Sequence, residues 1–145
     1  MTIYIDADAC PVVDITLLIA KEFAIPCVIL CDTAHHIQRQ GAQTLTVSKG
    51  ADSVDFKLVN MIRKGDLAIT QDYGLAAMCL AKGALALHQN GIRYTDENID
   101  GLLHSRYAAK KVRAAGGRMK GPRPRTKAED LAFSKALREL LENPL

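Results

Sequence analysis

The chain has 145 residues, of which 48% are hydrophobic and 24% charged, and this predicts one globular domain with a sizeable core. It has no Trp and only 5% aromatic residues, which argues against an aromatic base-stacking surface as the main binding device. No apolar stretch approaches the roughly 18 residues of a membrane span, and no secretory signal is recognisable. We therefore expect a cytoplasmic protein that does not enter a membrane.

Charge is distributed unevenly along the chain. The net charge is +3, yet residues 104–127 contain nine Lys or Arg and no Asp or Glu, so this segment carries +9 and the remainder −6. An acidic body with a basic C-terminal arm is typical of proteins that bind a polyanion. The segment predicts a nucleic acid as partner, and its Lys and Arg side chains as the groups that neutralise phosphates.

The first half of the chain alternates short apolar strands with helical segments. The first strand is expected at 3–5, and Pro11 suits the start of the helix that follows it. Further strands are expected at 27–31 and 44–47, separated by a polar loop, and a helix then ends at Gly65. The apolar positions of these two helices are Val12, Ile15, Leu18, Ile19 and Phe23, and Val54, Leu58, Met61 and Ile62.

The second half continues the alternation and ends in two longer helices. Strands are expected at 67–70 and 84–88 around a short helix, and 92–95 is a possible edge strand after the Asn90-Gly91 turn. A helix over 97–115 precedes an exposed loop, and a Thr126–Glu129 capping box opens the last helix. Its apolar face is predicted to be Leu131, Phe133, Leu137, Leu140 and Leu141.

This alternation predicts an α/β fold with a mostly parallel five-stranded sheet in the order 3-2-1-4-5 and helices on both faces. We expect residues 1–101 to form the core and 102–145 a basic helical extension packed on the same domain. The cysteines at positions 10, 27, 31 and 79 form no Cys-x-x-Cys pair and no zinc set, which indicates reduced thiols. Cys27 and Cys31 share one face of a strand and are expected in the core.

Acidic residues stand where the expected strands end. Asp6 and Asp8 lie two apart at the end of the first strand and so share a face, and Asp72 follows the fourth strand directly. In the order 3-2-1-4-5 the first and fourth strands are neighbours, so these carboxylates meet at one edge of the sheet. Asp55, on the helix after the third strand, could add a further oxygen. Such a set repels itself unless a hard divalent cation lies between its members.

Each acid except Asp6 also has a simpler structural explanation. Asp72 could cap the helix that starts near Tyr73, Asp52 could cap the helix that carries Asp55, and Asp8 could cap the helix after Pro11. Asp6 lies inside the end of a strand, where helix capping does not apply.

Four segments of the chain resemble the bacterial YaiI/YqxD-type family. They are Ile-Tyr-Ile-Asp-Ala-Asp-Ala-Cys-Pro at 3–11, Gly-Ala-Asp-Ser-Val-Asp at 50–55, Gly-Asp-Leu-Ala-Ile-Thr-Gln-Asp-Tyr-Gly-Leu-Ala at 65–76 and Thr-Asp-Glu-Asn-Ile-Asp at 95–100. The resemblance covers nearly the whole chain, basic tail included. More distantly, the chain resembles the PIN-like nuclease superfamily.

The PIN-like resemblance implies a divalent-metal site. A strand-one Asp, an acid on a middle helix and a Thr-x-Asp after strand four bind metal in that superfamily, and the matching positions are Asp6, Asp55, Thr70 and Asp72. Asp8 is an extra acid. Many PIN domains have another acid after the Thr-x-Asp, whereas this chain has none between Tyr73 and Thr95, so one metal or two stays open and Asp96 is a possible substitute.

The hypothesis that follows is a Mg²⁺- or Mn²⁺-dependent phosphodiesterase that acts on nucleic acid, RNA more than DNA. Asp6, Asp8, Asp55 and Asp72 hold the metal, and Thr70 or Gln71 orients a phosphate oxygen or a water. Backbone phosphates are neutralised by the basic arm, and the expected nucleic-acid-binding residues are Arg106, Lys110, Lys111, Arg113, Arg118, Lys120, Arg123 and Arg125.

Two other classes of function stay open. One is a non-catalytic RNA- or ribosome-associated protein that keeps the fold and the basic arm. The other is a haloacid-dehalogenase-like phosphatase with Asp6 as nucleophile, although no later Asp-Asp pair follows a strand. His35 and His36, adjacent in a polar loop, are weak candidates for a substrate contact. His88 and His104 are isolated, and we assign them no role.

Overall fold

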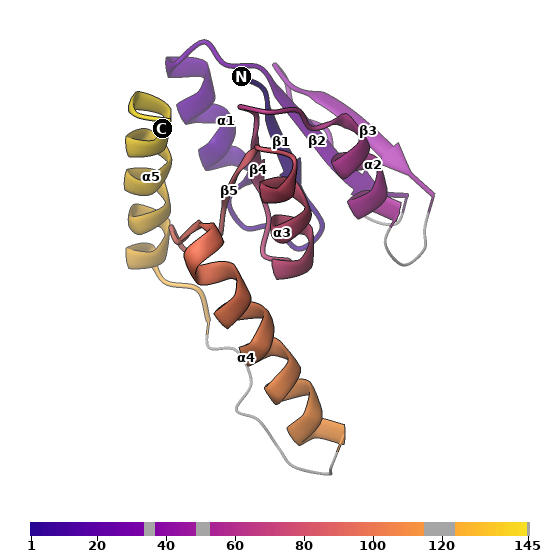
Figure 1. Ribbon diagram of the computed structural model, residues 1–145. Coiled ribbons are helices and arrows are strands. Elements are labelled where there is room, and N and C mark those ends of the chain that lie inside the picture. Colours follow the sequence, from indigo (N-terminus) through magenta and orange to yellow (C-terminus); the bar gives the residue numbers. More distant parts are fainter. Residues whose placement is uncertain (34–36, 49–52, 115–123, 145) are drawn as a thin grey trace.

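The computed structural model describes residues 1–33, 37–48, 53–114 and 124–144, apart from the side chains of 53 and 106–114. These ranges contain six strands and five helices, arranged as Figure 1 shows. In chain order they are β1 Ile3–Asp6, α1 Val13–Glu22, β2 Cys27–Asp32, β3 Gln43–Val47, α2 Ser53–Met61, β4 Leu67–Ile69, α3 Tyr73–Ala81, β5 Leu85–Leu87, β6 Arg93–Tyr94, α4 Asp96–Ala114 and α5 Lys127–Glu142.

The strands form one sheet in the order β3-β2-β1-β4-β5-β6. The first five are parallel, as the alternation of strands and helices predicted, while β6 pairs antiparallel with β5 and makes the sheet six-stranded rather than five-stranded. The chain moves outward from β1 to β2 and β3, then crosses to β4 on the other side. The carboxyl ends of β1 and β4 are thus the point where strand order reverses, the usual place for a site in an open α/β sheet.

Alternate residues of the strands face two different helical layers. Ile3, Ile5 and Ile69 pack into the apolar cluster of α1 and α5, whereas Tyr4, Leu30 and Ala68 pack into the cluster of α2 and α3. Figure 1 shows α1 and α5 side by side on one face of the sheet, and α2 and α3 on the other. Since even-numbered residues of β1 point toward α2 and α3, the same parity directs Asp6 to that side.

Helix α1 buries a different stripe from the one predicted. Leu18, expected in the core, is 62% exposed, while Thr16 is fully buried beside Ile19 and Ala20. The hydroxyl of Thr16 donates to the Val12 carbonyl oxygen over 2.7 Å, which satisfies the polar group inside the apolar layer. The prediction for Leu18 was wrong because the buried stripe is centred on Thr16, and a residue two positions away lies on the opposite side of a helix.

Helix α5 is part of the core. It begins with the predicted capping box, in which the Thr126 hydroxyl accepts from the Glu129 N–H and the Glu129 side chain accepts from the Thr126 N–H. Phe133, Leu137, Leu140 and Leu141 are buried against α1 and the sheet. Leu131, also predicted on the apolar face, is instead 71% exposed, because it lies on the opposite side of the helix from Phe133.

Helix α4 packs on the fold through its first turns. Ile99 is buried with Ala76, Ala86 and Tyr94, and Leu102 and Leu103 pack partly against this cluster. Beyond that contact Figure 1 shows the helix leading away from the sheet.

The cysteine prediction is confirmed, since all four are free and Cys27, Cys31 and Cys79 are buried. Within the described ranges, no helix combines the length and apolar character needed to cross a membrane.

Candidate active site

The centre of the site is the pair Asp6 and Thr70. Asp6 is the last residue of β1 and Thr70 directly follows β4, so the pairing of Ile5 with Ile69 brings the two side chains to the same level. The Thr70 hydroxyl donates to Asp6 Oδ2 over 2.7 Å. A hydroxyl–carboxylate hydrogen bond of this length is a strong, charge-assisted one, and it fixes the orientation of the Asp6 carboxylate.

Thr70 is itself held from three sides. It is 2% exposed, and its N–H donates to the Leu87 carbonyl oxygen of β5 over 3.2 Å. Its hydroxyl oxygen accepts from the Asp72 N–H at 3.0 Å, and its carbonyl oxygen accepts from the Tyr94 hydroxyl at 3.1 Å. Thr70 therefore joins β1, β5 and β6 at the carboxyl edge of the sheet.

Three carboxylates gather at this edge. Desolvation and the charges of Asp8 and Asp72 raise the pKa of Asp6 to about 6, against the hydrogen bond from Thr70, which lowers it. Asp8 and Asp72 thus lie near enough to Asp6 for their charges to act on it. The structure thus brings Asp6, Asp8 and Asp72 together, as the strand order predicted.

Asp72 has the capping role that the sequence left open as an alternative. It is the N-cap of α3, and its Oδ1 accepts from the N–H groups of Gly74 at 2.9 Å and Leu75 at 3.2 Å. This capping leaves the carboxylate at the carboxyl edge of the sheet, beside Thr70. The two interpretations of Asp72 are therefore compatible.

Asp8 does not cap α1. The N-cap of that helix is Val12, without a side-chain hydrogen bond, and Asp8 Oδ1 instead accepts from the Asp32 N–H at the end of β2, at 3.3 Å. The next residue, Ala9, has a φ of +56°, a left-handed conformation that is costly for a residue with a Cβ. The chain is therefore strained just where it leaves the acidic edge. Asp52, the other predicted cap, lies outside the described residues.

Asp55 lies on the same side of the sheet as Asp6. It stands in the first turn of α2, the helix that packs with α3 over this face. Burial raises the pKa of the Cys79 thiol of α3; the Lys82 charge acts against this, and the charges of both Asp55 and Asp6 act with it. Asp96, the possible substitute acid, is exposed in the first turn of α4.

The donor set matches a hard divalent cation in chemistry but is not closed in geometry. Carboxylate and hydroxyl oxygens are the ligands that Mg²⁺ and Mn²⁺ prefer, and the mutual repulsion around Asp6 is what a cation would relieve. As the side chains stand, however, no three His, Cys, Asp or Glu among the described residues form a group that could hold a metal. The described residues therefore suit a divalent cation by the type and charge of their oxygen atoms, and not by their present arrangement.

Sequence reasoning missed an aromatic group beside the carboxylates. Tyr73, His88 and Tyr94 lie with ring centroids 6.0–6.3 Å apart in tilted and edge-to-face arrangements. His88 was set aside as isolated, yet it follows β5 directly, next to Thr70 on the neighbouring strand. Burial lowers the pKa of His88, and the nearby Arg125 charge lowers it further. His88 follows β5 and Tyr94 ends β6, so their positions at strand ends could have indicated a place near the site. From the sequence we applied this criterion to acidic residues alone.

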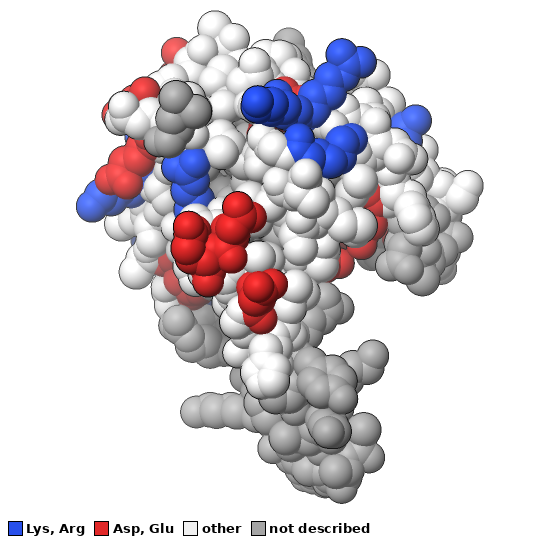
Figure 2. Space-filling view, in the orientation of Figure 1, with Lys and Arg blue, Asp and Glu red and all other residues white. Residues whose placement is uncertain are grey.

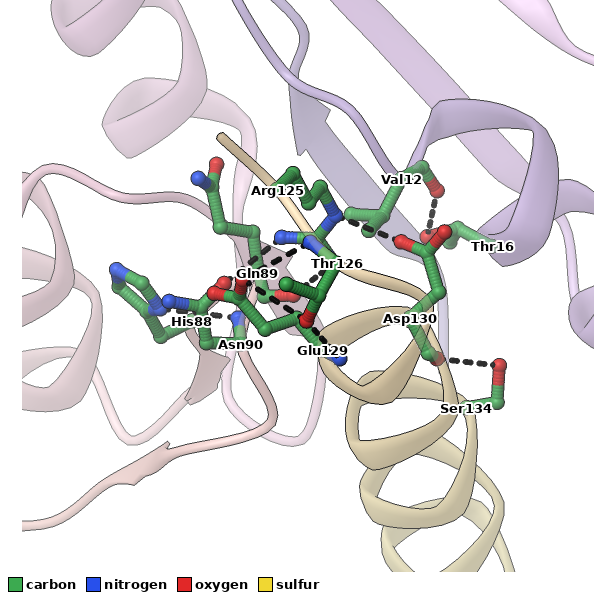
Figure 3. A network of polar contacts seen from close by, with 10 residues as sticks. All are labelled: Val12, Thr16, His88, Gln89, Asn90, Arg125, Thr126, Glu129, Asp130 and Ser134. Atoms are coloured by element: carbon green, nitrogen blue, oxygen red, sulfur yellow. Dashed lines mark hydrogen bonds and ion pairs between the residues drawn. The ribbon is translucent and has the colours of Figure 1, made fainter. Parts of the chain in front are cut away.

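Arg125 makes contacts within the fold. Its Nη1 donates to Asn90 Oδ1 at 2.7 Å, its Nη2 to the Gln89 carbonyl oxygen at 2.8 Å, and its Nε to Asp130 Oδ1 at 2.6 Å. Figure 3 shows the guanidinium between the turn after β5 and the first turns of α5. This arginine joins two elements of the fold and lies close to the acidic edge.

The other residues predicted to bind nucleic acid are not described at the level of side chains. Arg106, Lys110, Lys111 and Arg113 lie on α4, while Arg118, Lys120 and Arg123, like His35 and His36, fall outside the described residues. In Figure 2 acidic side chains gather over the start of α4, whose first turn carries Asp96 and Glu97. The charge of α4 therefore changes from acidic at its anchored start to basic toward Ala114.

One family model matches nearly the whole chain. A family model described as "Uncharacterized BCR, YaiI/YqxD family" matches residues 4–143. The chain belongs to this family. The resemblance inferred from the four sequence segments is thereby confirmed.

Relatives of known sequence span the same length. The UPF0178 protein of Exiguobacterium sibiricum is 49% identical over 141 residues, which cover 97% of this chain and 96% of the relative. The UPF0178 protein of Ruminiclostridium cellulolyticum is 51% identical over 137 residues, with 94% and 90% covered. These names state no activity, so the similarity shows the family of the chain and not its reaction.

Among solved structures, a mutant of Rae1 (YacP) from Bacillus subtilis resembles the chain over 100% of both lengths. The TM-score is 0.44 and the sequence identity 15%. A likeness at this level carries no argument about what the present chain does.

Proposed function

We propose that this YaiI/YqxD family member is a Mg²⁺- or Mn²⁺-dependent phosphodiesterase that hydrolyses nucleic acid, with RNA the favoured substrate. The observation that carries the proposal is the convergence of Asp6, Asp8 and Asp72 at the point where strand order reverses. Burying carboxylates beside one another costs folding free energy. Such an arrangement is typical of a site whose task needs the charge.

The chain's own residues supply position and charge. Asp6, Asp8, Asp55 and Asp72 would hold the cation, which when bound would acidify a water and polarise a phosphate oxygen. Thr70 keeps the Asp6 carboxylate in one orientation through its hydroxyl. Gln71, exposed between Thr70 and Asp72, would donate to a phosphate oxygen or to a water.

The positive charge of the basic arm favours a long polyanion as substrate over a small phosphate ester. Residues 104–127 carry +9 and begin within α4, whose first turns pack in the cluster that contains Tyr94. Positive charge along such a segment attracts a nucleic-acid backbone toward the molecule. The carboxylates alone would repel it, so the two features together favour a nucleic-acid substrate over a free phosphate monoester.

Cleavage of a labelled single-stranded RNA in Mn²⁺ tests the proposal. Wild-type protein and Asp6→Asn are purified in parallel and assayed with and without EDTA. We expect cleavage by wild type in Mn²⁺, and a loss of at least about 100-fold both in EDTA and in Asp6→Asn, the scale seen when a principal electrostatic group is removed. Equal cleavage in all four reactions would identify a contaminating nuclease and refute the proposal.

A second candidate is a non-catalytic RNA-binding protein. It is favoured by the hydrogen bonds that already engage Asp72 and Asp8 with backbone N–H groups, and by the open geometry of the described acids. RNA binding that is unaffected by EDTA, with no cleavage by wild type, would support this candidate.

A further inference from the structure

The short strand β6 contacts the acidic site without contributing a carboxylate. Tyr94 is 1% exposed, and its hydroxyl donates to the Thr70 carbonyl oxygen over 3.1 Å. The Thr70 hydroxyl in turn donates to Asp6 and accepts from the Asp72 N–H. A single buried hydroxyl therefore holds the residue that orients one acid and anchors the backbone of another.

Core packing alone does not require this hydroxyl. The neighbours of Tyr94 in its apolar cluster are Ala76, Ala86 and Ile99, which a phenylalanine ring would contact equally well. Burial raises the pKa of Tyr94 far above its ordinary value, so the hydroxyl stays protonated and serves as a donor. A hydroxyl buried in an apolar cluster adds little net stability even when it is hydrogen-bonded. The role that is left for the Tyr94 hydroxyl is to fix the position of Thr70.

The hairpin that carries Tyr94 is fixed from the other face of the sheet. Gly91, in its turn, has a φ of +88°, and a Cβ there would lie 2.6 Å from the Ala132 carbonyl oxygen of α5. Arg125 holds the two preceding residues, Gln89 and Asn90, and is tied to α5 through Asp130 (Figure 3). The turn therefore packs closely against the start of α5 and is linked to it by hydrogen bonds through Arg125.

A further contact joins the turn to the aromatic group. The Asn90 N–H donates to His88 Nδ1 at 3.0 Å, so the neutral imidazole carries its proton on Nε2. The ring of His88 lies 6.0 Å from that of Tyr94, edge to face. The path from Arg125 to Asp6 thus runs through Asn90, His88, Tyr94 and Thr70 in unbroken contact.

We propose that the β5–β6 hairpin is the positioning element of the acidic site, with Tyr94 as its positioning residue and Arg125 as the clamp on its turn. The proposal rests on the proposed function only for the reaction that the site performs. The positioning itself is measurable without any turnover. Tyr94 does not touch substrate in this account and acts through Thr70.

Amide hydrogen exchange of Tyr94→Phe tests the positioning directly. Tyr73→Phe is the matched control, because it removes a hydroxyl from the adjacent ring of the same group. We expect exchange at the Asp72 N–H to accelerate about fivefold in Tyr94→Phe, equivalent to about 1 kcal/mol for one hydrogen bond, while the sheet-centre amides of Ile5 and Ile29 stay unchanged. If RNA cleavage is present, kcat should fall with KM unchanged.

Two results would overturn the proposal. One is unchanged exchange at Asp72 in Tyr94→Phe; the other is equal acceleration at Asp72, Ile5 and Ile29, which indicates general destabilisation. Absence of cleavage by wild-type protein would refute the proposed function but leave the exchange result decisive for the hairpin.

A second variant tests the clamp. Arg125→Met keeps the length of the stem and removes the guanidinium, and Arg39→Met, which breaks the exposed ion pair with Asp14, is its control. We expect faster exchange at the N–H groups of Asn90 and Asp72 in Arg125→Met alone. Faster exchange at Asn90 without any change at Asp72 would separate the clamp from the site and contradict its assigned role.

Discussion

At the scale of single residues, Asp6 is the proposed metal ligand whose ionisation lowers the stability of the folded protein. Thr70 holds its carboxyl in a half-buried position, where desolvation and the neighbouring acids oppose its ionisation. Its position at a strand end indicated a functional role in the sequence, because a cap or a turn could not explain it. The contacts of Tyr94 and Arg125 were not predictable in the same way, since they join residues 24 and 35 apart through tertiary packing.

Neutralising Asp6 should stabilise the protein at neutral pH. Because the pKa is about 6 in the folded state and 3.8 in the reference state, the folded protein binds more protons between these values and loses stability as pH rises through them. In metal-free buffer we expect Asp6→Asn to raise the free energy of unfolding by on the order of 2 kcal/mol at pH 7.5 and by almost nothing near pH 4.

Urea denaturation at several pH values measures this difference, and Asp14→Asn, at an acid whose side chain is 73% exposed, serves as control. A stability gain for Asp6→Asn that does not depend on pH would mean that ionisation of Asp6 is not the source of the cost.

At the scale of secondary-structure elements, apolar runs and turn residues predicted most of the strands and helices. The errors lie where neighbouring elements decide the outcome. Leu18 and Leu131 fit a helical period, but the angular position of α1 and of α5 on the sheet leaves them exposed. Residues 102–145 were expected as an extension packed on the same domain, and the apolar face of α5 within it lies in one cluster with α1.

Truncation of α5 side chains separates a core helix from an attached one. We expect Phe133→Ala, at a fully buried ring, to lower the free energy of unfolding by about 3–5 kcal/mol. Leu131→Ala on the same helix should change it by less than about 0.5 kcal/mol. Denaturation curves of the two variants supply the comparison, and similar small losses for both would show that α5 is not part of the cooperative core.

The close contact between the β5–β6 turn and α5 predicts a specific need for glycine. Gly91→Ala places a Cβ 2.6 Å from a backbone oxygen, whereas Gly65→Ala, at a similar φ of +86°, meets nothing within 4 Å. Both variants carry the cost of about 1–2 kcal/mol for a left-handed residue with a Cβ, so any further loss in Gly91→Ala measures the contact with α5. Equal melting temperatures would contradict the close approach.

At the scale of the whole molecule, an acidic body is combined with a basic arm. The sheet order and the parity of its strands direct the carboxylates to the α2–α3 face, and α4 starts beside them with the arm's positive charge farther along. The order of the first five strands was predictable from the sequence, and the charge blocks are read from it directly. The separation of the carboxylates was not predictable, because it depends on side-chain orientations that tertiary packing decides.

Salt dependence tests the part played by the arm in binding. If about six phosphates are contacted, the logarithm of the RNA association constant should fall against the logarithm of salt concentration with a slope near −5. Fluorescence anisotropy with a labelled RNA in EDTA measures the slope without cleavage. Replacing Lys110, Lys111 and Arg113 by Gln should reduce its magnitude by about 2 to 3, and an unchanged slope would place the contacts elsewhere.

The most direct test of the central claim is a calorimetric Mn²⁺ titration of wild-type protein, Asp6→Asn and Asp72→Asn, with Asp14→Asn as control. The account predicts saturable binding by wild type and by Asp14→Asn, and affinity at least about tenfold weaker in the other two variants, the lower end of the loss seen even when a group that only supports a ligand is removed. Equal Mn²⁺ affinity in all four proteins, or no saturable binding by any of them, would contradict it.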